Sequence, residues 1–112
     1  MRDSEPEPDI VVIRGKARDF ASRHPRPGEA GLVVEVSDPS LSRDRGYKRQ
    51  FYGEAGIPYY WIANLIDRRI EVYSEPANGD YTVRRDYAPG EAIPLILDGV
   101  AVAQIGTGDL IP

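Results

Sequence analysis

The sequence predicts a fold of mixed helix and strand, α/β (α+β), in which one helix packs on a β-sheet. Three observations lead to this prediction. Short β-branched runs recur along the 112 residues, one segment with helical spacing follows the second run, and alternating runs separated by turn residues occupy the rest of the chain. The length fits one small domain and excludes a second full one.

The first third of the chain is predicted to hold two strands. Residues 1–8 carry three acids and two prolines, which predicts an extended lead-in before a single domain at 9–112. The β-branched run at 9–13 predicts the first strand, and two prolines and a glycine make 16–30 a connecting loop. The run at 31–37 is almost continuously apolar, which is typical of a central strand buried on both faces.

A helix and further strands are predicted after that central strand. Ser42 is expected to cap a helix that runs to Ala55 and ends at Gly56, before Pro58. Turn residues at 76–80 and at Asp98-Gly99 predict tight reversals between antiparallel strands. The strands themselves are predicted at 59–65, 70–73, 81–87, 93–97 and 100–105.

The composition excludes several kinds of site. The chain has no cysteine and one histidine, His24, so disulfides, thiolate zinc sites, iron–sulfur clusters and multi-histidine metal sites are excluded. Any metal must therefore bind to oxygen ligands, and no organic cofactor is predicted. The formal net charge of −4 argues against a strongly basic nucleic-acid binder. No apolar run suits a membrane span or a signal peptide, which predicts a cytoplasmic protein without membrane contact.

Three polar residues stand in apolar surroundings. Asp9 opens the first predicted strand, Glu35 lies inside the second, and Lys48 lies on the helix. Because side chains alternate along a strand, Glu35 shares a face with Val33 and Ser37. Burial of its ionised carboxylate requires a cation, a metal, strong donors or protonation. If the two strands are neighbours, Asp9 and Glu35 can converge on Mg²⁺, with carbonyl oxygens and water completing the shell.

Helical spacing brings further charged residues to one side. Asp44, Lys48 and Tyr52 recur every four residues and share a face, while Arg45 and Arg49 form a neighbouring stripe that could meet phosphate. A lysine beside metal-bound carboxylates can orient water and offset charge on a phosphate. Phosphodiester hydrolysis requires both.

Each of these residues also has a plain structural interpretation. Asp9 can cap a strand or turn, and Glu35 can form a buried salt bridge with an arginine. Lys48 and Asp44 can form an ordinary i,i+4 pair on the helix, and Tyr52 can be a core residue. Spacing alone leaves both interpretations open.

Longer stretches of the sequence resemble a known family. They are EPEPDIVV at 5–12, HP at 24–25, LVVEVSDPS at 32–40, DRGYK at 44–48, Tyr52, AGIP at 55–58, YWI at 60–62 and DLIP at 109–112. In this order they look like the Uma-two family, which is described as putative restriction endonucleases. The resemblance covers nearly the whole chain.

The resemblance implies a restriction-endonuclease-like fold, with a mixed sheet, a helix after the central strand, and antiparallel strands at the C-terminal end. It also implies a PD-(D/E)xK site in which Asp9 and Glu35 are the acids. Lys48 then takes the place of the usual lysine two residues after the second acid, where this chain has Ser37. Asp9, Glu35 and the backbone carbonyl of Val36 are expected to bind Mg²⁺ or Mn²⁺, and Lys48 to position water for DNA cleavage. The residues expected to support them are Ser37, Asp44 and Tyr52.

Members of that family carry several tens of residues before the Pro-Asp motif. The resemblance therefore implies either that 9–112 is a nuclease-like domain without its N-terminal part, or that the chain folds by another arrangement in which exposed strand edges pair with a second copy as a dimer. A rival hypothesis is a catalytically inactive, self-associating module that keeps the nuclease fold as a scaffold. A third is that the two acids bind a metal only structurally.

Overall fold

The computed structural model of the protein describes residues 9–13, 30–37 and 41–111. The predicted lead-in at 1–8 and the predicted loop up to residue 29, with His24, lie outside the described residues. The helical stretch begins at Leu41, so Ser42 lies inside it and not at the predicted cap position, and the Ser42 side chain lies outside the described residues. No helix within the described ranges is long and apolar enough to cross a membrane.

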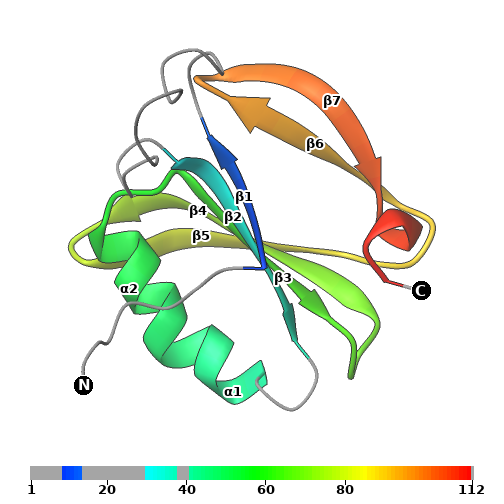
Figure 1. Ribbon diagram of the computed structural model, residues 1–112, viewed down its shortest axis with the longest axis horizontal. Helices are drawn as coiled ribbons and strands as arrows, with labels where there is room; N and C mark the ends of the chain where they lie inside the picture. Colours follow the sequence, from blue (N-terminus) through cyan, green and yellow to red (C-terminus); the bar gives the residue numbers. More distant parts are fainter. Residues whose placement is uncertain (1–8, 14–29, 38–40, 112) are drawn as a thin grey trace, which may run out of the picture.

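A five-stranded sheet forms the centre of the fold, in the order β1-β2-β3-β4-β5 (Figure 1). The strands are β1 (Ile10–Ile13), β2 (Ala30–Ser37), β3 (Tyr59–Asn64), β4 (Arg69–Ala77) and β5 (Asp80–Tyr87). β2 and β3 run parallel and the other neighbouring pairs run antiparallel, so the sheet is mixed, as predicted. A parallel pair requires a crossover, which the helical stretch between β2 and β3 supplies.

This helical stretch has three parts. They are α1 (Leu41–Arg43), the π-helical η3 (Asp44–Lys48) and α2 (Arg49–Glu54). It ends at Gly56 as predicted: the Ile57 amide donates to the Tyr52 carbonyl at 3.2 Å and the Gly56 amide to the Gly53 carbonyl at 3.1 Å. Gly56 closes this Schellman ending with a φ of +77°, which glycine adopts without strain. The π-helical part was not predicted, because residue spacing does not separate π from α turns.

The strand β4 is longer than predicted. Residues 70–73 were predicted, but the strand continues to Ala77 because the chain reverses at Asn78-Gly79, where both residues have positive φ as a type I′ turn requires. Pro76 is tolerated within the strand because it lies beyond Ser74, the last β4 residue that pairs with β3.

A second, two-stranded antiparallel sheet follows β5. It consists of β6 (Ala92–Leu97) and β7 (Val100–Gly106), and a 3₁₀ turn at Thr107–Asp109 follows it. Asp98 and Gly99 join the strands with φ values of 51° and 79°, which confirms the predicted tight turn.

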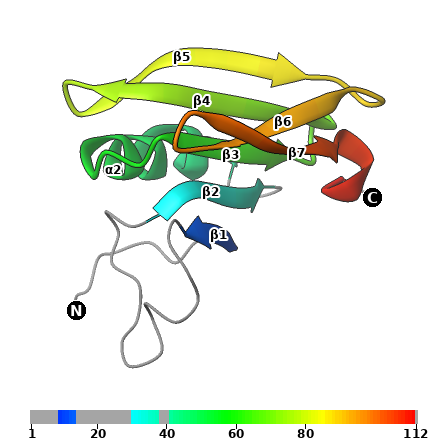
Figure 2. The same cartoon turned by 90° about the horizontal axis from the view of Figure 1, so that it is seen from above.

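The alternation of side chains gives the five-stranded sheet two apolar faces. One packs against the helical stretch through a cluster that includes Val33 and Tyr60. The other packs against the β6–β7 hairpin through a cluster that includes Trp61 and Ile93. Figures 1 and 2 show the helix and the hairpin on opposite sides of the sheet. β2 lies inside the sheet and is buried on both faces except at Val36, which is 38% exposed.

Candidate active site

Glu35 lies in β2, and Asp9 directly precedes the neighbouring strand β1, which begins at Ile10 and not at Asp9 as predicted. Ile10 pairs with Val34 in the antiparallel β1–β2 ladder, so Asp9, one residue earlier, lies opposite Glu35 and on its face of the sheet. Oδ2 of Asp9 accepts a hydrogen bond of 2.7 Å from the Val36 amide. Asp9 is exposed, whereas Glu35 is only 2% exposed. The structure therefore brings together the two acids singled out from the sequence and sets them at the boundary between solvent and core.

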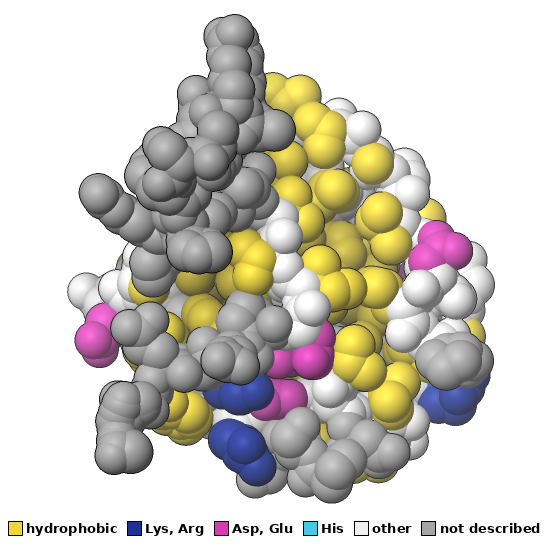
Figure 3. All heavy atoms as spheres, in the orientation of Figure 1, with side chains coloured by type: hydrophobic (Ala, Val, Ile, Leu, Met, Phe, Trp, Pro, Cys, Tyr) yellow, Lys and Arg dark blue, Asp and Glu magenta, His cyan; other side chains and the backbone are white. Residues whose placement is uncertain are grey.

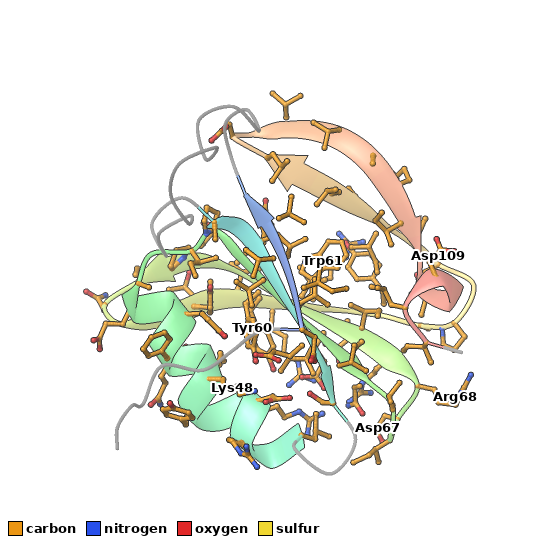
Figure 4. All side chains as sticks on the ribbon, viewed as in Figure 1. Lys48, Tyr60, Trp61, Asp67, Arg68 and Asp109 are labelled. Atoms are coloured by element: carbon orange, nitrogen blue, oxygen red, sulfur yellow. The ribbon has the colours of Figure 1, made fainter. Side chains whose placement is uncertain are left out.

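Lys48 reaches this pair from the helix. Its Nζ lies 3.3 Å from Oε2 of Glu35 and 3.2 Å from Oδ1 of Asp44, the latter an i,i+4 contact as predicted. Both acids are buried, while the lysine side chain keeps 14% of its surface exposed. Figure 4 shows Lys48 between the helix and the sheet, on the side opposite Trp61. The buried cation partner of Glu35 is thus a lysine, where the sequence had suggested an arginine as the structural alternative.

The charges of this cluster depend on one another. Burial raises the pKa of the Glu35 carboxyl, and the Lys48 ammonium offsets part of the rise. Burial on its own would lower the pKa of Lys48, but Glu35 and Asp44 outweigh it, so the pKa is raised. Lys48 therefore stays protonated at neutral pH. Because the pKa of Glu35 is raised even with Lys48 beside it, further positive charge would stabilise the ionised carboxylate.

Three hydroxyl groups hold the two buried acids. The Tyr52 hydroxyl donates to Oε2 of Glu35 at 3.3 Å, and the Ser37 hydroxyl donates to Oδ2 of Asp44. The Tyr60 hydroxyl donates to the backbone carbonyl of Asp44 at 3.0 Å. Ser37, Asp44 and Tyr52 thus contact or support the acid–lysine cluster as expected from the sequence, and Tyr60 joins them from β3.

A third buried carboxylate, Glu71 in β4, was not predicted. The register pairs Glu35 with Ile62 and Ile62 with Glu71, so both acids lie on the helix-facing side of the sheet, two strands apart. The alternation of residues 70–73 places Glu71 on the same face as Tyr73 but does not tell which face meets the helix. The register supplies this information, and it depends on strand pairing across the whole sheet.

The arginine stripe of the helix is bound to the sheet. Arg45 donates through Nε to both carboxylate oxygens of Glu71 at 3.1 Å, and Nη2 of Arg49 lies 2.9 Å from Oδ2 of Asp80. Both guanidinium groups therefore attach the helix to β4 and to the start of β5. This replaces the free phosphate-binding stripe considered from the sequence.

The donor set at the acid pair suits a hard divalent cation. Asp9 and Glu35 offer carboxylate oxygens next to the backbone of Val36, and the raised pKa of Glu35 marks a carboxylate that a bound cation would stabilise. Within the described ranges, no three His, Cys, Asp or Glu side chains gather into a metal-binding group. A magnesium ion would thus take two carboxylates from these ranges, with carbonyl and water oxygens beside them, an arrangement that Mg²⁺ accepts.

The surface around the cluster is mixed in character. In the view of Figure 3, acidic and basic side chains lie side by side below the centre, beside a broad hydrophobic area over the β6–β7 side of the molecule. The cluster of Glu35, Asp44 and Lys48 is partly accessible to solvent, because the Lys48 side chain keeps 14% of its surface exposed.

The mixed sheet, with its helical crossover after the central strand, has the restriction-endonuclease-like architecture that the sequence motifs implied. The chain belongs to the Uma2 family, whose model, described as a putative restriction endonuclease, matches residues 1–104. This match confirms the resemblance found in the sequence motifs.

A solved structure confirms the fold. The chain is similar to a protein from Anabaena variabilis ATCC 29413 described as a putative nuclease belonging to DUF820, with a TM-score of 0.53 and 16% sequence identity. The match covers 72% of this chain and 43% of that one, so the chain corresponds to less than half of its length. A search of curated proteins gives no match.

Proposed function

We propose that the protein is a metal-dependent endonuclease that hydrolyses phosphodiester bonds in DNA. The observation that supports this is the cluster of an exposed acid, a buried acid and an ammonium group, with Nζ of Lys48 3.3 Å from Oε2 of Glu35. The cluster occurs in a member of a family described as putative restriction endonucleases. Asp9, directly before β1, lies opposite Glu35 in β2, an arrangement that suits one shared cation.

In this proposal Asp9, Glu35 and the backbone carbonyl of Val36 bind Mg²⁺ or Mn²⁺. The metal would supply a Lewis acid for the phosphate and a bound water of lowered pKa. The protein's own groups prepare the site: the Val36 amide fixes Oδ2 of Asp9, and the Tyr52 hydroxyl and Lys48 fix Oε2 of Glu35. Groups held in this way need little rearrangement when the substrate arrives.

Lys48 is proposed to act on the substrate directly. Its ammonium keeps its proton because Glu35 and Asp44 raise its pKa, so it offers a permanent positive charge beside the proposed metal ligands. Such a charge stabilises the negative charge that develops on a phosphate and orients an attacking water through a hydrogen bond. The partial exposure of the side chain leaves room for a phosphate to approach.

A plasmid assay tests the proposal. Purified chain is incubated with supercoiled DNA and Mg²⁺ or Mn²⁺, beside Asp9→Ala, Glu35→Ala and Lys48→Ala variants. Nicked and linear products from the wild type, together with their loss in all three variants, would support the site. Equal cleavage by all four proteins would reject it. A folded wild type that neither cleaves DNA nor binds Mn²⁺ would favour the inactive scaffold.

Self-association is the second role we propose, with β7 as the pairing edge. Residues 100–106 carry no charge and no proline, and Val100 and Val102 are 60% and 55% exposed. The edge strand β5 differs, since it carries Arg84, Arg85 and Asp86. Natural edges are usually protected by charge or proline, so an unprotected one is a candidate for pairing with a second copy. Light scattering measures the molar mass of the wild type and of Val102→Lys. A dimeric wild type and a monomeric variant would support this proposal, and a monomeric wild type would contradict it.

A cytoplasmic location remains a prediction from the sequence, and it agrees with a DNA substrate.

A further inference from the structure

Glu71 is fully buried but lies outside the proposed cleavage chemistry. Among the described residues, four side chains bind its carboxylate: Arg45 at 3.1 Å, Asn64 at 2.9 Å, Tyr73 at 2.8 Å and Arg84 at 3.5 Å. They come from the π-helical segment η3 and from β3, β4 and β5. Donors from four elements restrict the position of this buried carboxylate and join the four elements to one another.

The donor from the helix, Arg45, lies in the same segment as Lys48 of the proposed site. Arg45 directly follows Asp44 and lies three residues before Lys48, and all three belong to η3. The segment has no side-chain cap at its start, and π-helical turns are rare because context must hold them. Three of its side chains contact the sheet: Asp44 accepts from Ser37, Lys48 pairs with Glu35, and Arg45 binds Glu71.

We propose that Glu71 is a positioning residue for the active site. By binding Arg45 through both carboxylate oxygens, it sets the rotation of η3 about the helix axis and so keeps Nζ of Lys48 against Glu35. The catalytic consequence rests on the proposed function, whereas the structural link between Glu71 and η3 does not.

Amide hydrogen exchange of the whole chain tests that link without an activity. Glu71→Gln removes the charge that holds Arg45 and is expected to speed exchange of amides in 44–48 by roughly tenfold or more relative to those in β2. Asp80→Asn is the matched control, because it weakens the ion pair that joins Arg49 in α2 to the sheet. It is expected to leave exchange in 44–48 unchanged.

Two outcomes of the exchange experiment would overturn the proposal. One is unchanged exchange in 44–48, and the other is an equal increase at all protected amides, which would mean general destabilisation. If Glu71→Gln does not fold, Arg45→Gln provides the same test, because it breaks the link and leaves Glu71 its other donors.

Cleavage kinetics give the second readout. Glu71→Gln and Arg45→Gln are each expected to lower kcat about tenfold or more with little change in KM, and Asp80→Asn to leave kcat unchanged. Because both substitutions remove the same Arg45–Glu71 contact, the kcat of the double variant should be no lower than that of the slower single variant. Additive losses, or a raised KM in Arg45→Gln alone, would contradict the positioning role. A wild type without cleavage would reject the proposed function, while the exchange data would still decide whether Glu71 positions η3.

Discussion

Nζ of Lys48 lies 3.3 Å from Oε2 of Glu35 and, at the same time, 3.2 Å from Oδ1 of Asp44, so one lysine compensates two buried acids. Lys48→Met is therefore expected to lower the free energy of unfolding by about 3 kcal/mol at pH 7. The loss should shrink as the pH falls towards 5, because burial already raises the pKa of Glu35 and removal of the lysine raises it further. Urea unfolding at both pH values measures this, and an equal loss at both would contradict the prediction.

Glu71 is expected to make the fold sensitive to acid. Burial on its own would raise its pKa, but hydrogen bonds from Arg45, Tyr73 and Asn64 outweigh burial and lower the pKa from 4.5 to about 2. An acid with a lowered pKa stabilises the fold above its unfolded value, and this stabilisation disappears as the pH falls through the folded value. At neutral pH the shift corresponds to roughly 3 kcal/mol.

The test of that expectation is unfolding of the wild type and Glu71→Gln between pH 7 and 2. The wild type should lose stability relative to the variant as the pH falls from about 4.5 to about 2. A constant difference between the two proteins over this range would mean that Glu71 keeps an ordinary pKa.

Metal binding is expected to depend on Asp9 and Glu35. Asp9→Asn and Glu35→Gln should each weaken Mn²⁺ binding about tenfold or more in calorimetric titration, because each removes a charged oxygen ligand. Glu54→Gln is the control, since Glu54 is an exposed acid at the end of α2, beside Gly79 of the β4–β5 turn. Equal affinities in all three variants and the wild type would place any bound Mn²⁺ elsewhere.

Two glycines of the helical stretch should respond oppositely to alanine. A Cβ on Gly53 would lie 2.8 Å from backbone atoms of Asp80, so Gly53→Ala should destabilise the protein by about 1–3 kcal/mol. At Gly46 no atom beyond the adjoining helix backbone lies within 4 Å of the added Cβ, and alanine should raise stability by up to about 1 kcal/mol. Thermal unfolding compares them, and similar changes in Tm would show that α2 does not approach the β4–β5 turn this closely.

Most of the fold could be predicted from the sequence because its signals are local. The turn pairs Asn78-Gly79 and Asp98-Gly99 need a backbone that few other residues adopt, and Gly56 ends the helix for the same reason. The acid pair could also be predicted, since Asp9 and Glu35 stand out in apolar runs. Lys48 was singled out with them, the family resemblance gave it the role of the motif lysine, and the structure shows its contact with Glu35.

The remaining features depend on register and packing. Glu71 lies in an ordinary alternating strand, and its pairing through Ile62 to Glu35 emerges only when three strands are in place. The attachment of Arg45 to Glu71, in place of a free phosphate-binding stripe, follows from the same register. Residue spacing could not reveal the π turn at 44–48 either, since that turn depends on how the helix packs on the sheet.

Cleavage of supercoiled plasmid by the wild type, Glu35→Gln and Glu54→Gln in Mn²⁺ tests the central proposal most directly. We expect the wild type and Glu54→Gln to nick the plasmid at similar rates, Glu35→Gln to be slower by about 10²-fold or more, and EDTA to stop all cleavage. Cleavage by Glu35→Gln at the wild-type rate, or cleavage that persists in EDTA, would contradict a metal-dependent site built on Asp9, Glu35 and Lys48.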